Sequence, residues 1–123
     1  MKSLKLIFAS LIISFGVNAQ KATQKKMDRN YLSPEQKAKF QTEKMKTELN
    51  LSNEQYDKAY QINMGIVQKN KSLEDQKMTT YERENAVKQN KEARILMLKE
   101  VLSAEQFNKM QENLKENKQA DKE

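Results

Sequence analysis

The side chains best able to do chemistry in this 123-residue sequence are its 17 Asp and Glu and its 23 Lys and Arg residues. Histidine and cysteine are absent from it, which excludes thiolate or imidazole metal sites, disulfides and histidine-dependent nucleophiles. Two glycines are too few for a phosphate-binding loop. Charged pairs such as Glu84 with Lys88 have the i,i+4 spacing of solvated neighbours on a helix. We therefore expect no catalytic residues, no cofactor and no metal site.

One motif, Leu-Ser-x-Glu-Gln, occurs three times, at residues 32–36, 51–55 and 102–106. It has the form of a capping box, in which the serine accepts from an N–H three residues on and the glutamine reaches back to the serine N–H. The leading leucine can pack against the first turn as a hydrophobic staple. This structural capping role is assigned to Leu51, Ser52, Gln55, Leu102, Ser103 and Gln106. A weaker box at Thr79 and Glu82 marks a fourth helix start.

These helix starts, with a composition rich in Lys, Glu, Gln, Met, Ala and Leu, predict an all-α fold. We expect four helices in the order short-long-long-short, near residues 34–48, 53–77, 80–101 and 104–118. Their short connections favour antiparallel neighbours. Leu, Ile, Val and Phe are scarce after residue 19, so a monomer would be marginally stable. We therefore expect a homodimer in which a second copy covers apolar surface.

The second expected helix carries an apolar arc wider than that of a simple surface helix. By 100° spacing, one flank holds Ala59, Ile62, Ile66 and Leu73. The adjoining flank is rich in Tyr and Met, and Met97 lies on a comparable flank of the third helix. Either these helices are buried on two sides of a bundle, or the second flank stays partly open for adaptable binding. The candidate binding residues of that flank are Tyr56, Tyr60, Met64, Val67, Met78 and Met97.

The first residues have the anatomy of a secretory signal peptide. A positive segment at 1–5 precedes an apolar run at 6–15, and Val17 and Ala19 provide the small residues of a cut after Ala19. The run is shorter than the ~20 residues that a membrane-spanning helix needs. We predict an exported, periplasmic protein with no stable membrane insertion.

The expected organisation is a signal peptide at 1–19, a basic disordered arm at 20–32, a helical domain at 33–118 and a disordered tail at 119–123. The arm carries Lys21, Lys25, Lys26 and Arg29 against Asp28, whereas the charges of the remainder nearly balance. A nucleic-acid surface needs a basic stripe on the folded part, so we expect no nucleic-acid partner. The arm either touches anionic lipid or is a solvated tail, and we favour the tail.

The two later motifs resemble the LTxxQ motif of the Spy/CpxP family, because each is expected to open a helix behind a leader sequence. They read Leu51-Ser52-Asn53-Glu54-Gln55 and Leu102-Ser103-Ala104-Glu105-Gln106. The chain is similar to the short, Lys/Glu-rich members of that family. The resemblance implies a periplasmic antiparallel helical hairpin that dimerises into a cradle.

The same resemblance implies a function. It suggests an ATP-independent chaperone (holdase) or an envelope-stress-response protein, with unfolded or partly folded envelope proteins as partners. The alternative is a dedicated regulatory or structural partner of one envelope protein, with no general chaperone activity.

Overall fold

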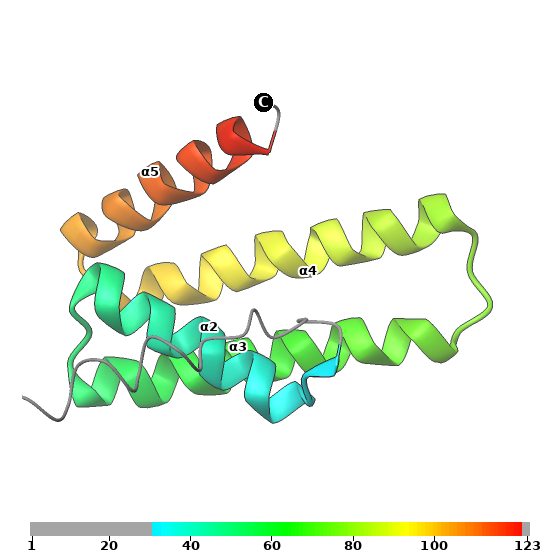
Figure 1. The fold of residues 1–123 in the computed structure, drawn as a ribbon, viewed down its shortest axis with the longest axis horizontal. Helices are drawn as coiled ribbons and strands as arrows, with labels where there is room; N and C mark the ends of the chain where they lie inside the picture. Colours follow the sequence, from blue (N-terminus) through cyan, green and yellow to red (C-terminus); the bar gives the residue numbers. More distant parts are fainter. Residues whose placement is uncertain (1–30, 122–123) are drawn as a thin grey trace, which may run out of the picture. The chain divides into compact units, whose positions relative to one another are not determined.

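Four α-helices and no strand make up residues 31–121, the part of the chain that the computed structural model describes (Figure 1). The helices are α2 (Pro34–Leu49), α3 (Asn53–Ser72), α4 (Thr80–Val101) and α5 (Ala104–Ala120), with a 3-10 turn, η2 (Leu73–Asp75), after α3. The expectation of an all-α fold with four helices is confirmed. The expected signal peptide at 1–19 and all of the expected arm except Tyr31 and Leu32 lie outside the described residues.

Each of the four helices begins with a complete capping box. The capping side chain accepts from the backbone of the third helical residue, whose own side chain accepts from the cap N–H, at 2.9–3.2 Å. The caps are Ser33, Ser52, Thr79 and Ser103. Each box satisfies backbone donors that the first turn of a helix leaves without a partner. The four starts therefore follow from the local chemistry of each segment.

Two helix ends differ from the sequence prediction. α3 ends at Ser72 rather than near residue 77, because the chain tightens there into η2, where the Leu73 N–H donates to the Asn70 carbonyl three residues back. The Ser72 hydroxyl also donates to the Lys69 carbonyl (2.7 Å). α5 continues to Ala120, beyond the expected end at 118 and into the expected tail. Its last residues are good helix formers and no helix breaker precedes Asp121.

The hydrophobic core lies near the two later Leu-Ser-x-Glu-Gln motifs. Its buried members are Met45, Leu49, Leu51, Ala59, Leu98, Leu102 and Met110, with Ile62, Ile95, Phe107 and Leu114 packed against them. Leu51 and Leu102, the leucines that open the two motifs, are both buried in this core. No residue from 68 to 97 is buried. Residues 68–72 of α3 and 80–97 of α4 therefore have no core of their own.

α3 and α4 lie side by side (Figure 1), and two hydrogen bonds between their side chains mark their register. Asn90 Nδ2 donates to Asn70 Oδ1 (2.8 Å) and Arg94 Nε donates to Asn63 Oδ1 (2.6 Å). Residue numbers rise along α4 as they fall along α3, so the two helices run in opposite directions. α2 packs against α3, and its buried residues are Ala38, Thr42, Met45 and Leu49. None of the described helices is both long and apolar enough to cross a membrane.

Candidate functional site

The two later motifs meet through their glutamines, here called the glutamine pair (Gln55 and Gln106). Gln55 Nε2 donates to Gln106 Oε1 (2.7 Å), and Gln106 Nε2 donates back to Gln55 Oε1 (3.1 Å). Each Nε2 also donates at 3.2 Å to the last carbonyl of the helix that precedes the other motif. These acceptors are Val101 O for Gln55 and Leu49 O for Gln106. The glutamine pair thereby joins the α2–α3 junction to the α4–α5 junction.

The glutamine pair has a tertiary role that the sequence does not assign to it. Each Oε1 still accepts from its own cap, Ser52 N–H or Ser103 N–H (3.0 and 2.9 Å), so one amide serves both the cap and the partner motif. A carboxylate in this position could accept but not donate, and Glu82 at the start of α4 makes only its cap. The sequence signal for this role is that both motifs have glutamine at the same position. The sequence does not show that the two glutamines contact each other, because the fold brings them together.

A buried polar chain crosses from α2 to α4 and consists of Thr42, Asn63 and Arg94. Thr42 and Asn63 are fully buried. Asn63 Nδ2 donates to Thr42 Oγ1 (3.0 Å), and Arg94 Nε donates to Asn63 Oδ1 (2.6 Å). Asn63 lies one turn from Ala59 and from Ile66 on the predicted apolar arc, so the spacing alone signals that it is buried. Its partners come from two other helices and cannot be read from the sequence.

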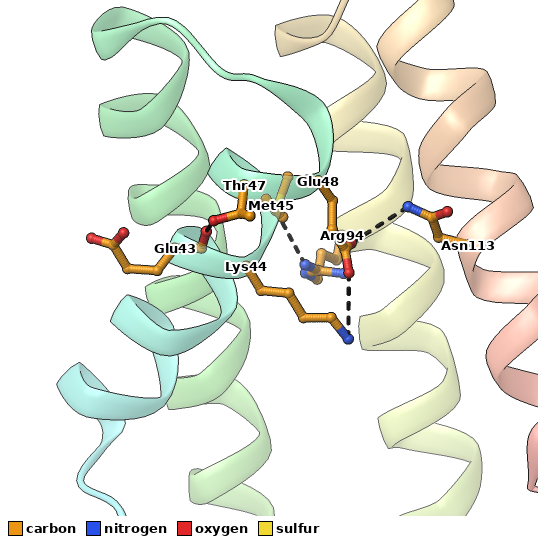
Figure 2. Close-up of polar contacts among 7 residues, drawn as sticks. All are labelled: Glu43, Lys44, Met45, Thr47, Glu48, Arg94 and Asn113. Atoms are coloured by element: carbon orange, nitrogen blue, oxygen red, sulfur yellow. Dashed lines mark hydrogen bonds and ion pairs between the residues drawn. The ribbon is translucent and has the colours of Figure 1, made fainter. Parts of the chain in front are cut away.

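Arg94 has no carboxylate partner among the ion pairs of the described residues. Besides Asn63 it contacts Met45, with Nη2 3.5 Å from Sδ (Figure 2). The nearby carboxylate of Glu48 is engaged with Lys44 Nζ (3.8 Å) and with Asn113 Nδ2 (3.5 Å). Burial lowers the pKa of the Arg94 guanidinium below its ordinary value, because removing a charge from water disfavours the charged form.

A shallow groove of about 480 Å³ opens between α2 and α3 and is here called the tyrosine groove. Its lining residues are Lys39, Tyr56, Asp57, Tyr60 and Gln61. Tyr56 and Tyr60 are one turn apart on α3 and both are half-buried. Two aromatic rings with a mixture of ammonium, carboxylate and amide groups around them make a surface suited to reversible, amphipathic contacts.

Two side chains of α2 fix Tyr56 at the edge of this groove. The Tyr56 hydroxyl donates to Glu43 Oε1 (2.8 Å), and Lys46 Nζ lies 5.4 Å from the centre of its ring. The hydrogen bond to Glu43, followed by desolvation and by the negative charge of Glu43, raises the pKa of Tyr56 above its ordinary 10.0. A phenolate would lose the hydrogen bond and repel the carboxylate.

The structure distributes the six candidate binding residues over four environments. Tyr56, Tyr60 and Met64 are half-buried at i, i+4, i+8 spacing along α3, whereas Val67 is buried. Met78 does not lie on a helix as predicted, because α3 ends at Ser72 and residue 78 belongs to the connection before α4. Met97 is 40% exposed on α4. Only the two tyrosines line the tyrosine groove.

Comparison with protein families finds a match to the family described as Domain of unknown function (DUF4890), over residues 19–123. The chain belongs to the DUF4890 family. Neither curated proteins nor solved structures give a match. The DUF4890 region includes both later motifs, the glutamine pair, the buried polar chain and the tyrosine groove.

Within residues 31–121 of this DUF4890 chain, no group of three or more carboxylates is placed to hold a metal ion. What the described residues do offer is a set of amide, phenol and ammonium groups beside aromatic rings. Such groups can hold a partner by hydrogen bonds and by contact with an apolar face.

Proposed function

We propose that this protein is an exported, periplasmic binding protein that holds unfolded or partly folded envelope proteins without ATP, as a chaperone or within an envelope stress response. The observation that carries the proposal is the tyrosine groove, where Tyr56 and Tyr60 lie among charged and amide side chains. Short apolar segments of a client can lie on the rings while its polar groups remain hydrated. Tyr81 and Leu96 on α4 are 73% and 66% exposed and lie outside this groove.

A Spy/CpxP-like antiparallel hairpin of α3 and α4, paired with a second copy in a dimeric cradle, belongs to the same proposal. Three observations support it: the opposite directions of the two helices, the contact between the two motifs, and the stretch from 68 to 97 without a buried residue. A second copy would cover apolar side chains in that stretch. Sedimentation equilibrium should give twice the mass of one chain.

Export, and the absence of a nucleic-acid partner, of membrane insertion and of catalysis, are also proposed. The leader-like segment at 1–19 supports export, and the family match begins at residue 19, beside the cut proposed after Ala19. Fractionation of cells, with N-terminal sequencing of the exported chain, tests both the compartment and the cut.

Light scattering of a refolding client tests the holdase activity directly. The protein should suppress aggregation at a few-fold molar excess with no nucleotide. Suppression that persists at high salt indicates apolar contact, because salt screens exposed charges. No suppression across several unrelated clients would overturn the chaperone proposal.

A matched pair of double variants tests whether the tyrosine groove is the contact site. Tyr56→Ser with Tyr60→Ser removes the rings that line the groove, and Tyr81→Ser with Leu96→Ser removes exposed apolar side chains from α4. The groove variant should lose most of its suppression while the α4 variant keeps it. The reverse result would place the contact site on α4. Far-UV circular dichroism checks that both variants remain helical.

A dedicated partner of one envelope protein is the alternative. Lys39, Asp57 and Gln61 favour it, because fixed polar groups in a groove can select one ligand by its hydrogen-bonding pattern. Proximity labelling in the envelope distinguishes the two functions. One dominant labelled protein indicates a dedicated partner, and many labelled proteins indicate a chaperone.

A further inference from the structure

The sulfur of Met45 is the meeting point of two N–H donors from different helices. Asn63 Nδ2 on α3 lies 3.6 Å from it, and Arg94 Nη2 on α4 lies 3.5 Å from it (Figure 2 shows the Arg94 contact). A thioether is a weak acceptor. Asn63 is fully buried, and Met45 is 6% exposed. Two N–H donors therefore share one weak acceptor, the Met45 sulfur. One of these donors belongs to Arg94, a cation without a carboxylate partner.

Met110 is a natural comparison within the same core. It is also 6% exposed and belongs to the same hydrophobic cluster as Met45. Among the contacts of the described residues, no donor reaches its sulfur. The two methionines are thus matched in burial and differ in the polar groups around the sulfur.

We propose that Met45 is a site of oxidation to methionine sulfoxide, and that Asn63 Nδ2 and Arg94 Nη2 bind the sulfoxide oxygen. This inference does not depend on the proposed function.

The oxidant is a hydroperoxide, with hydrogen peroxide as the simplest case. A sulfur lone pair attacks one peroxide oxygen, the S–O bond forms and the O–O bond breaks. The proton on the transferred oxygen passes to the departing hydroxide, which leaves as water. Sulfur is oxidised by two electrons and the peroxide is reduced by two.

The consequence of this oxidation is opposite to the usual one for a core methionine. A sulfoxide in an apolar core is a buried polar group without partners, which destabilises the fold. At Met45 the partners are already present, and the new oxygen is a far stronger acceptor than the thioether. Met45, Asn63 and Arg94 belong to α2, α3 and α4 respectively. Hydrogen bonds to the sulfoxide oxygen therefore link three helices.

Two single-substitution backgrounds test the proposal in the purified protein. In Met110→Leu the core methionine available to peroxide is Met45, and in Met45→Leu it is Met110. Both backgrounds keep the remaining methionines, so their oxidation affects the two equally. Peptide mass spectrometry measures the conversion of each methionine, and thermal unfolding measures the effect.

Oxidised Met110→Leu protein should keep its unfolding midpoint within about 2 °C, whereas the midpoint of oxidised Met45→Leu protein should fall by about 10 °C. An equal fall in both backgrounds would overturn the proposal. So would an unmodified Met45 under conditions that fully convert the exposed Met97.

A second pair of variants needs no oxidant. Gln in place of Met puts an amide oxygen near the position of the sulfoxide oxygen. Met45→Gln should leave the midpoint within about 2 °C, and Met110→Gln should lower it by about 10 °C. Adding Arg94→Met to Met45→Gln should lower the midpoint by about a further 5 °C, because both the Nη2 donor to residue 45 and the Nε donor to Asn63 Oδ1 are lost. If Met45→Gln is as destabilising as Met110→Gln, the two donors do not form an oxygen-binding site.

Discussion

Replacing Gln55 by Glu separates the glutamine pair from the capping box. The carboxylate can still accept from Ser52 N–H, as Glu82 accepts from its own cap at 2.9 Å, so the cap survives. It cannot donate, so the hydrogen bonds to Val101 O (3.2 Å) and to Gln106 Oε1 (2.7 Å) are lost. Each lost hydrogen bond contributes about 1 kcal/mol, and the new carboxylate is left facing the two acceptor oxygens with no donor between them. The free energy of unfolding should therefore fall by about 2–3 kcal/mol. For a domain of this size the midpoint should fall by about 10 °C or more.

Gln36→Glu is the matched control for this substitution. Gln36 completes the capping box of α2 with Ser33, and its side chain has no hydrogen bond to another helix in the described part of the chain. Glu is an equally good capping partner at this position, so the control should change stability by less than about 0.5 kcal/mol. Urea unfolding followed by far-UV circular dichroism measures both variants. If Gln55→Glu costs no more than Gln36→Glu, the glutamine pair does not hold the two junctions together.

Four further substitutions have defined expectations. Gly65→Ala should stabilise the protein by about 1 kcal/mol in urea unfolding, because a Cβ there meets no atom within 4 Å and Gly65 lies inside α3; an unchanged urea midpoint would contradict this. Asn63→Ala should cost about 2–4 kcal/mol, since Arg94 Nε loses its acceptor. Asn113→Ala, which loses only a 3.5 Å contact with Glu48, should cost less than about 0.5 kcal/mol, and equal costs would refute the importance of the polar chain. Glu43→Gln should lower the pKa of Tyr56 toward 10.0 in an ultraviolet titration, because the first cause of its rise is the hydrogen bond to Glu43. The folded-state pKa of Tyr56 is raised, so its contribution to stability is complete below pH 10.0 and is lost as the pH rises through the folded-state value; no difference between the variant and the parent protein would contradict the assignment.

The helix starts could be predicted from the sequence because capping is local. Each box uses a cap and a residue three positions later, so the box of Ser52 and Gln55 can be recognised from the sequence without knowledge of the fold. The helix ends are harder, since no glycine marks them. α3 ended at Ser72, where the chain tightens into η2, and the apolar spacing did not reveal this end.

The candidate site was less predictable because its parts are assembled by tertiary contacts. The spacing placed Tyr56 and Tyr60 together on one flank, and both line the same groove. It could not show that α2 supplies Glu43 as the partner of Tyr56, or that Gln106 is the partner of Gln55. These contacts join residues far apart in the sequence, and their existence depends on how whole helices pack.

The stretch from 68 to 97 without a buried residue has a consequence for how the sequence can vary in length. Local opening near the η2 connection breaks backbone hydrogen bonds but uncovers no core, so those amides should exchange with solvent at a lower free energy than those around the glutamine pair. Matched deletions of about one turn from residues 68–72 of α3 and from the first half of α4 would shorten both helices and leave every buried residue in place. The length of the paired helices α3 and α4 can therefore change, in evolution or by design, separately from the stability of the domain.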